Sequence, residues 1–126
     1  MDQFLWVCLG SALGGGLRYL ASEWALRVWG PAFPVGTVGV NLLGSFALAA
    51  LMGAGADGWS PSLRLALTTG LMGGFTTYST FNFDTFRCLQ QGAYGAAFLH
   101  VVVTLAGCLL ASAAGFALGR GLGGAP

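Results

Sequence analysis

Polar side chains able to form hydrogen bonds recur inside otherwise apolar stretches of this chain. Most are hydroxyls and amides, with few carboxylates among them. Hydroxyl and amide groups can donate to an anion, and no buried glutamate is available to exchange protons. The inventory therefore favours anion chemistry over cation or proton-coupled drug chemistry. The residues concerned are Arg18, Asn41, Thr68, Thr69, the cluster from Thr76 to Thr80, Asn82, Asp84, His100, Thr104 and Ser112.

The densest polar cluster follows a pair of glycines in the sequence Gly73-Gly74-Phe75-Thr76-Thr77-Tyr78-Ser79-Thr80-Phe81. This pattern predicts a helix break. If a membrane segment begins at Leu63, Gly73 lies roughly 15 Å along it, about the midplane of a ~30 Å hydrocarbon layer. Backbone groups released at that depth must line a cavity or bind a ligand, because lipid cannot form hydrogen bonds with them. A transport pathway is the leading interpretation.

The composition indicates an integral membrane protein. The chain has 126 residues, of which 56% are hydrophobic and 7% charged, and its mean hydropathy is +0.75. A membrane span needs about 20 apolar residues, and four stretches reach that length. We therefore expect an all-α protein with one four-helix transmembrane domain. The predicted spans are 4–28, 35–54, 63–86 with a break near 73–77, and 94–118.

The arginines give almost no signal for the orientation of the chain in the membrane. With four spans, Arg64 and Arg120 fall on the side of the termini, and Arg27 and Arg87 fall on the other side. Orientation normally follows an excess of basic residues on the cytoplasmic side. The balance predicts insertion in both orientations and pairing as an antiparallel dimer. One fixed orientation, set by Arg18 or by lipids, is the alternative.

Glycines and alanines spaced four residues apart predict close helix packing. Such stripes serve equally well for contacts within one subunit and for a dimer seam. They consist of Gly10 and Gly14 in the first span and of Gly107, Ala111, Gly115 and Gly119 in the fourth.

Three motifs, in order within a four-span chain, resemble those of the CrcB, or Fluc, family of fluoride channels. They are the runs 14–19 (GGGLRY), 36–44 (GTVGVNLLG) and 73–81 (GGFTTYSTF). The resemblance implies a dual-topology antiparallel homodimer that expels fluoride across the cell membrane through two pathways. It also implies a structural Na⁺ at the dimer centre, held by the backbone carbonyls of Gly73 and Thr76.

The resemblance places Tyr78 and Phe81 at the two aromatic positions of the family's pore. They are three residues apart on one helix face, and an aromatic ring carries a positive edge that attracts anions. The first position is commonly Phe, so the role of the Tyr78 hydroxyl stays open. Asn41 is the best single donor candidate. The predicted fluoride pathway comprises Asn41, Tyr78, Phe81, Ser79, Thr80, Thr104, Asp84 and Arg18.

A hydroxyl track with an acidic residue near its end is a further feature that the family implies. Thr80 and Asp84 are spaced i, i+4, and Thr104 lies about ten residues into the fourth span. Membrane hydroxyls also often bond their own i−4 carbonyl, which is the alternative for Thr104 and Ser112. Cys108 falls where a hydroxyl would extend the track.

Arg18 lies too deep to be an ordinary loop charge. It could snorkel, pair with Glu23 or Asp84, or line an aqueous vestibule. His100 has no partner at ligand spacing, so we expect a packed residue rather than a metal ligand.

Other function classes fit less well. Small multidrug resistance transporters are also short four-helix proteins, but their proton exchange needs a glutamate in the middle of the first helix, and Glu23 lies near its end. A non-transporting subunit would not explain the midplane hydroxyls. No nucleophile and base pair, phosphate loop or metal cluster can be assembled, so we expect no enzyme and no nucleic-acid partner. A passive fluoride channel is the preferred hypothesis.

Overall fold

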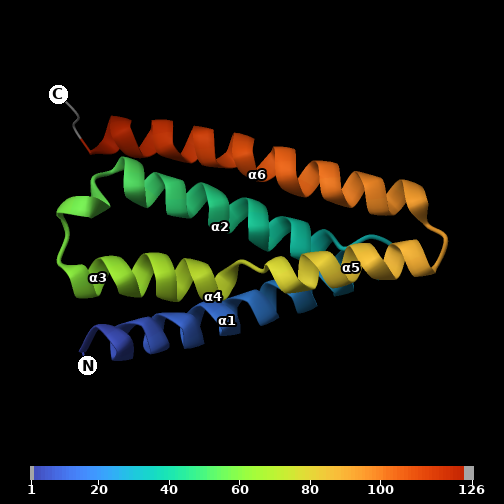
Figure 1. The fold of residues 1–126 in the computed structure, drawn as a ribbon, viewed down its shortest axis with the longest axis horizontal. Coiled ribbons are helices and arrows are strands. Elements are labelled where there is room, and N and C mark those ends of the chain that lie inside the picture. Colours follow the sequence, from blue (N-terminus) through green and yellow to red (C-terminus); the bar gives the residue numbers. More distant parts are fainter. Residues whose placement is uncertain (1, 124–126) are drawn as a thin grey trace.

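The computed structural model describes residues 2–123, and within that range it contains helices and no strands. Three long helices, α1 (Asp2–Trp29), α2 (Val35–Gly53) and α6 (Tyr94–Leu122), lie beside a fourth, segmented stretch (Figure 1). That stretch consists of the 3₁₀ turn η1 (Ala56–Gly58), α3 (Pro61–Leu65), the π-helix η2 (Ala66–Met72), α4 (Gly73–Phe75) and α5 (Tyr78–Gln90).

Among the described residues, α1, α2 and α6 are each long and apolar enough to cross a membrane. The third predicted span, 63–86, is not among them because it is divided into short segments. Burial also follows a membrane pattern: Leu109 and Phe98 are largely exposed, whereas His100 is fully buried. Lipid can cover apolar side chains, while polar groups must find partners inside the protein. The chain is an all-α, multi-pass membrane protein.

The backbone leaves the helical conformation at Thr76 and Thr77, inside the predicted range 73–77. Thr76 has φ −81° and ψ 160°, and Thr77 has φ −150° and ψ 123°, so both are extended. Gly73 itself is helical, with φ −63° and ψ −37°. The paired glycines therefore precede the break and do not form it.

The glycines instead allow close approach between neighbouring backbones. A Cβ added at Gly14 would overlap the carbonyl oxygen of Leu71, and one added at Gly74 would lie 2.6 Å from the carbonyl oxygen of Ser11. Through these contacts α1 packs directly against η2 and α4. In the same way, a Cβ at Gly115 would overlap the Phe46 carbonyl oxygen on α2. Both glycine stripes thus make contacts within one chain.

The two described ends of the chain lie at the same end of the bundle as α3, and the connection from α5 to α6 lies at the opposite end (Figure 1). Arg64 belongs to α3 and Arg120 to the last turn of α6, whereas Arg27 and Arg87 are in the last turns of α1 and α5. Two arginines therefore lie towards each end of the bundle.

Candidate functional site

Asn41 on α2 holds the interrupted backbone in place. Its side-chain Nδ2 donates to the Thr77 carbonyl oxygen at 2.9 Å, and its Oδ1 accepts from the Thr77 N–H at 2.7 Å. Asn41 and Thr77 are both 7% exposed. A buried peptide group outside a helix needs such partners, because leaving it unpaired costs about 1–3 kcal/mol. The Asn41 amide thus replaces the helical bonds that Thr77 lacks.

The pairing with Asn41 and the capping of α5 by Thr77 each release one carbonyl oxygen from helical hydrogen bonding. In an uninterrupted helix the Thr77 N–H would donate to the Gly73 carbonyl, but here it donates to Asn41. The Thr80 N–H would likewise donate to the Thr76 carbonyl, but it bonds the Thr77 hydroxyl at 3.2 Å, which caps α5. Gly73 and Thr76 therefore each have a carbonyl without its usual helical partner.

A recess of about 320 Å³, which we call the aromatic recess, opens beside the break. Within it, Phe81 is 5% exposed and Tyr78 is 74% exposed, and their ring centroids are 6.0 Å apart. The Thr104 hydroxyl lies here with no hydrogen-bond partner among the described residues. The lining comprises Asn41, Ser45, Thr76, Thr77, Tyr78, Phe81, Thr104, Leu105, Cys108 and Leu109.

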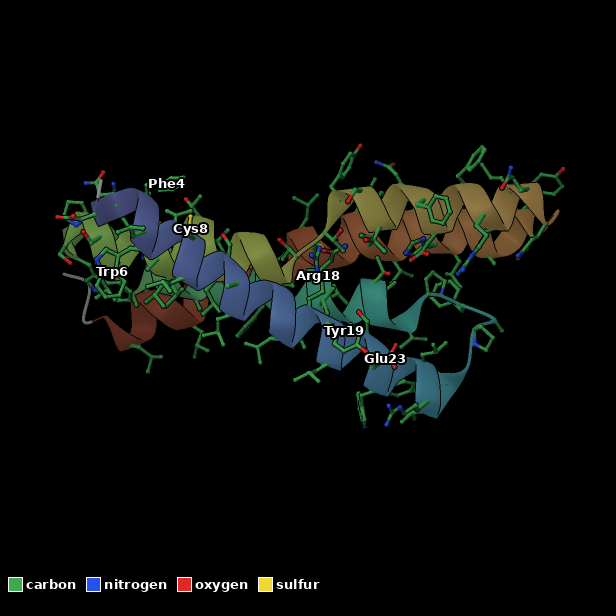
Figure 2. All side chains as sticks on the ribbon, turned by 90° about the horizontal axis from the view of Figure 1, so that it is seen from below. Phe4, Trp6, Cys8, Arg18, Tyr19 and Glu23 are labelled. Carbon is green, nitrogen blue, oxygen red and sulfur yellow. The ribbon has the colours of Figure 1, made fainter. Side chains whose placement is uncertain are left out.

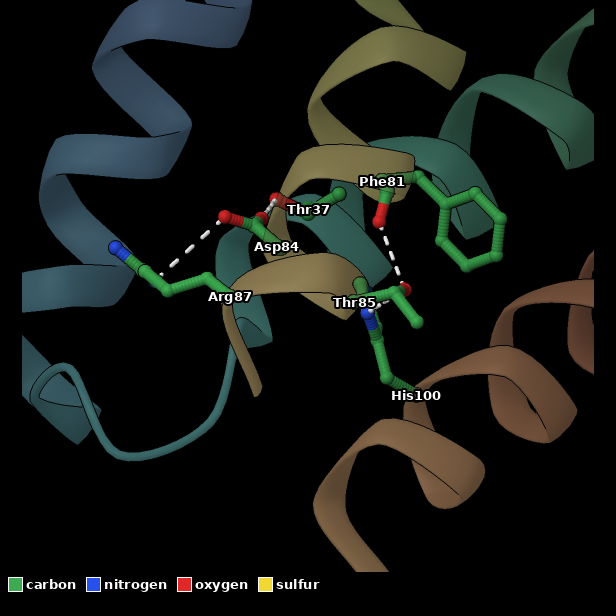
Figure 3. A network of polar contacts seen from close by, with 6 residues as sticks. All are labelled: Thr37, Phe81, Asp84, Thr85, Arg87 and His100. Atoms are coloured by element: carbon green, nitrogen blue, oxygen red, sulfur yellow. Dashed lines mark hydrogen bonds and ion pairs between the residues drawn. The ribbon is translucent and has the colours of Figure 1, made fainter. Parts of the chain in front are cut away.

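A second polar group lies on another side of α5 (Figure 3). The Thr37 hydroxyl donates to Asp84 Oδ2 at 2.6 Å, and Arg87 Nη2 lies 3.6 Å from Asp84 Oδ1. Asp84 is 9% exposed, so its charge is shared between one hydroxyl and one arginine instead of facing solvent. The group connects α2 to α5 one helical turn from Asn41.

Arg18 reaches from α1 towards the break and lines a recess of about 320 Å³, which we call the arginine recess (Figure 2). Within residues 2–123 it has no ion pair, because Glu23 pairs with Arg27 at 3.8 Å and Asp84 pairs with Arg87. The other lining residues are Gly15, Tyr19, Ser22, Thr37, Thr77 and Thr80. Of the alternatives for Arg18, pairing with Glu23 or Asp84 is not what the described residues show, because both carboxylates pair with other arginines.

Comparison with known proteins agrees with this architecture. A family model described as "CrcB-like protein, Camphor Resistance (CrcB)" matches residues 5–116. A protein of Anaeromyxobacter sp. (strain K) is 51% identical over 126 residues, which cover 98% of this chain and all of the relative. The chain belongs to the CrcB family. A relative from Sorangium cellulosum is 43% identical, over 97% of this chain and 98% of the relative. One from Geobacter sp. (strain M21) is 40% identical, over 97% of this chain and all of the relative. All three relatives are named fluoride-specific ion channel FluC.

The predicted pathway residues of this CrcB-family chain lie in two groups, one on each side of the helix break. Asn41, Tyr78, Phe81 and Thr104 line the aromatic recess. Arg18 and Thr80 line the arginine recess. Thr80 also lines, together with Asp84, a neighbouring recess of about 330 Å³ between α1, α2 and α5. Ser79 is exposed, with its hydroxyl 3.5 Å from that of Thr77. Within one subunit these residues do not form a single lining.

Some polar residues of this CrcB-family site were missed by the sequence analysis. Thr37 was noted only within a motif, although its spacing of four from Asn41 puts both on one face of α2. Thr77 appeared only within a cluster, but a threonine directly before a helix is a capping signal. Thr85, whose hydroxyl lies 3.0 Å from His100 Nδ1, had no sequence signal.

The hydroxyls on α6 of the CrcB-family chain behave differently from one another. Thr104 has no partner within residues 2–123, and so it does not bond its own i−4 carbonyl. Ser112 donates across to the Ser45 carbonyl oxygen at 3.4 Å. Cys108 lines the aromatic recess one turn after Thr104 and places a thiol there. His100 is a packed residue, with 0% exposure.

Proposed function

We propose that this chain forms a passive, fluoride-selective channel in the cell membrane that exports fluoride from the cytoplasm. The observation that carries the proposal is the Asn41-bound helix break beside an aromatic recess, in a chain whose relatives are named fluoride-specific ion channels. Those relatives are channels and not enzymes, and we expect no enzymatic activity here.

The aromatic recess has the chemistry to replace part of the hydration shell of a small anion. Tyr78 and Phe81 can present positive ring edges. The Thr104 hydroxyl is free to donate, and the Asn41 amide keeps one N–H beyond the hydrogen bond it makes to Thr77. Donors fixed in a low-dielectric setting interact with an anion more strongly than they would in water. Fluoride, as the smallest halide, would gain most from such close contacts.

We infer that the working unit is an antiparallel homodimer with four spans per subunit and two pores. The segmented stretch from Pro61 to Gln90 would be the remaining span, with its break near the midplane. In the single chain Tyr78 and Gly73 are exposed and the aromatic recess is open, so a second subunit could complete its wall. The balanced arginines would permit the two orientations.

A structural Na⁺ at the dimer centre is compatible with the residues at the break. Gly73 and Thr76 each have a carbonyl released from helical bonding, and carbonyl oxygens are suitable ligands for hard cations. When bound, the ion would supply positive charge that stabilises the subunit pair and lowers the cost of bringing an anion close. Asn41 would act by keeping the Gly73 carbonyl free, and the Thr77 hydroxyl by keeping the Thr76 carbonyl free.

Nothing in the described residues favours the alternative of a small multidrug resistance transporter. Glu23, the acid that would have to exchange protons, is near the end of α1 and pairs with Arg27 one turn later. A proton-coupling role needs an acid deep in the span, where its titration can be linked to substrate binding.

Fluoride efflux from liposomes containing the purified protein tests the proposal, with chloride as the control ion. We expect efflux of fluoride but not of chloride, and loss of that efflux in Phe81→Ile. The matched control is Phe98→Ile, which makes the same change at a 72% exposed position on α6 and should leave efflux within about twofold of wild type. Absence of fluoride efflux from well-folded wild-type protein would contradict the proposal.

A further inference from the structure

His100, the only histidine of the chain, is completely buried at a place that the proposed pathway does not use. Its ring lies at an edge-on angle to that of Phe81, with centroids 5.0 Å apart, and to that of Phe33, at 5.8 Å. A buried imidazole is costly unless its nitrogens find partners. Figure 3 shows its one hydrogen-bond partner among residues 2–123, Thr85 on α5.

The hydrogen bonds of Thr85 bear on the tautomer of the neutral imidazole. The Thr85 hydroxyl donates to the Phe81 carbonyl oxygen at 2.8 Å. With its proton directed there, Thr85 Oγ1 accepts from His100 Nδ1, which lies 3.0 Å away. In that arrangement neutral His100 carries its proton on Nδ1, and its Nε2 presents a bare lone pair. If the hydroxyl donated to Nδ1 instead, Nε2 would carry the proton.

Two buried polar atoms on α6 lack partners among the described residues, and these are His100 Nε2 and Thr104 Oγ1. The residues are four apart, so their side chains are neighbours on one face of the helix. Thr104 also lines the aromatic recess next to Phe81. An unpaired buried group costs about 1–3 kcal/mol, so two of them one turn apart on the same helix face point to a ligand that satisfies both.

The charges around His100 come mainly from α5. Complete burial of the ring opposes a positive charge on His100, and this is the larger effect, whereas the charge of Asp84 favours one. Arg87 lies 3.6 Å from Asp84 Oδ1 and partly neutralises that carboxylate. The thiol of Cys88 is the other buried titratable group on α5. The sequence of α2, which also packs against α6, contains no titratable residue, and Phe33 before it is apolar. Asp84 is thus the group that can support a positive charge on His100.

We propose that His100 and Thr104 form a proton-dependent anion position on α6, next to the aromatic recess. When His100 is neutral, Nε2 is an acceptor and repels an anion. When a proton from water binds Nε2, the imidazolium N–H and the Thr104 hydroxyl both become donors to one small anion. This inference rests on the proposed function, which supplies the anion, fluoride. It predicts that fluoride flux rises as the pH falls.

Nuclear magnetic resonance of protein labelled with ¹⁵N-histidine tests the protonation step directly, because the chain yields a single imidazole signal set. We titrate from about pH 8 down to about pH 5, and expect Nδ1 protonated and Nε2 unprotonated at the alkaline end and a second proton on Nε2 as the pH falls. Added fluoride should shift the Nε2 signal at the acidic end only. An Nε2–H tautomer at neutral pH, or a ring that never gains a second proton in this range, would overturn the inference.

Liposome efflux over the same pH range tests the consequence. We expect wild-type flux to rise roughly three- to tenfold on acidification, the change expected from gaining one charge-assisted hydrogen bond. Protein-free liposomes correct for fluoride that crosses lipid as hydrogen fluoride. His100→Gln, which stays neutral, should lose the pH dependence, and Thr104→Val should reduce the gain at low pH.

The outcomes separate this inference from the proposed function. Equal pH profiles in wild type and His100→Gln, with flux present at neutral pH, would overturn the role of His100 and leave the channel proposal standing. Absence of wild-type flux at every pH would overturn the channel proposal, and the fluoride-induced shift of the histidine signal would then decide the anion position alone. If His100→Gln does not fold, the wild-type titration still decides.

Discussion

Asn41 meets the backbone of Thr77 as a neighbouring peptide group would, with one donor and one acceptor. Both ends of its amide are used, so only one N–H remains for an anion in the aromatic recess. The sequence analysis treated Asn41 as a donor to fluoride. The structure adds a positioning role, because the same side chain takes the Thr77 N–H and so keeps the Gly73 carbonyl out of a helical bond.

Replacing Asn41 by aspartate should damage both roles. One carboxylate oxygen can still accept from the Thr77 N–H, but the other would face the Thr77 carbonyl oxygen, leaving a buried acceptor without a donor at a cost of about 1–3 kcal/mol. We expect a lower melting temperature in detergent and loss of most fluoride efflux. Asn82→Asp, which adds the same charge at an exposed position on α5, is the matched control. Equal losses in both variants would show that added charge alone is responsible.

Tight backbone contacts at the level of the helices hold the break in position. α1 packs against η2 and α4 through Gly10, Gly14 and Gly74, and α6 packs against α2 through Gly115 and Gly119. The second contact brings Thr104 and His100 on α6 to the side of the bundle where Asn41 lies. The break is therefore held from α1 on one side and from α2 on the other.

Gly14→Ala should disturb the helix break indirectly, by changing how α1 packs against it. Its added methyl group would overlap the Leu71 carbonyl oxygen, so α1 must move away, at a cost of about 1–3 kcal/mol. Gly16→Ala is the control, because its methyl group would meet nothing within 4 Å. We expect a lower melting temperature and slower fluoride efflux for Gly14→Ala, and no loss for Gly16→Ala. Equal behaviour of the two variants would contradict a packing role for Gly14.

For the molecule as a whole, the arginine balance and the open recess bear on the same question of assembly. The two ends of the bundle carry similar numbers of arginines, so the distribution of positive charge favours neither orientation in the membrane. The aromatic recess, the exposed ring of Tyr78 and the free carbonyl of Gly73 all border on space that a partner could fill. An antiparallel dimer would bring two such breaks together across its axis.

A labelling experiment on intact cells tests the orientation. A tag at the C-terminus should be accessible from outside in about half of the molecules, because the charge balance directs neither orientation. Adding two lysines after Arg120 should bias the population to one orientation and reduce fluoride efflux if the active dimer is antiparallel. A tag found on one side only in the unmodified protein would contradict dual topology.

Much of the architecture could be read from local features of the sequence. Apolar stretches of membrane length predicted the long helices, since hydrocarbon thickness sets the length of a span. The Gly73-Gly74 pair and the run of hydroxyl residues from Thr76 to Thr80 indicated the interruption near 73–77. The motifs around Arg18, Asn41 and Phe81 indicated the family, which the relatives show. These features depend on neighbouring residues along the chain, which is why the sequence reveals them.

Contacts between segments far apart in the sequence could be identified only from the tertiary structure. The pairing of Asn41 with Thr77 joins residues 36 apart, and that of Thr37 with Asp84 joins residues 47 apart. No periodicity reveals such pairs, and Gly74, one of the two glycines that marked the break, serves instead to bring α1 close. The tautomer of His100 depends on a hydroxyl from another helix. Hydrogen-bond direction and burial are properties of packed helices, so only the folded chain specifies them.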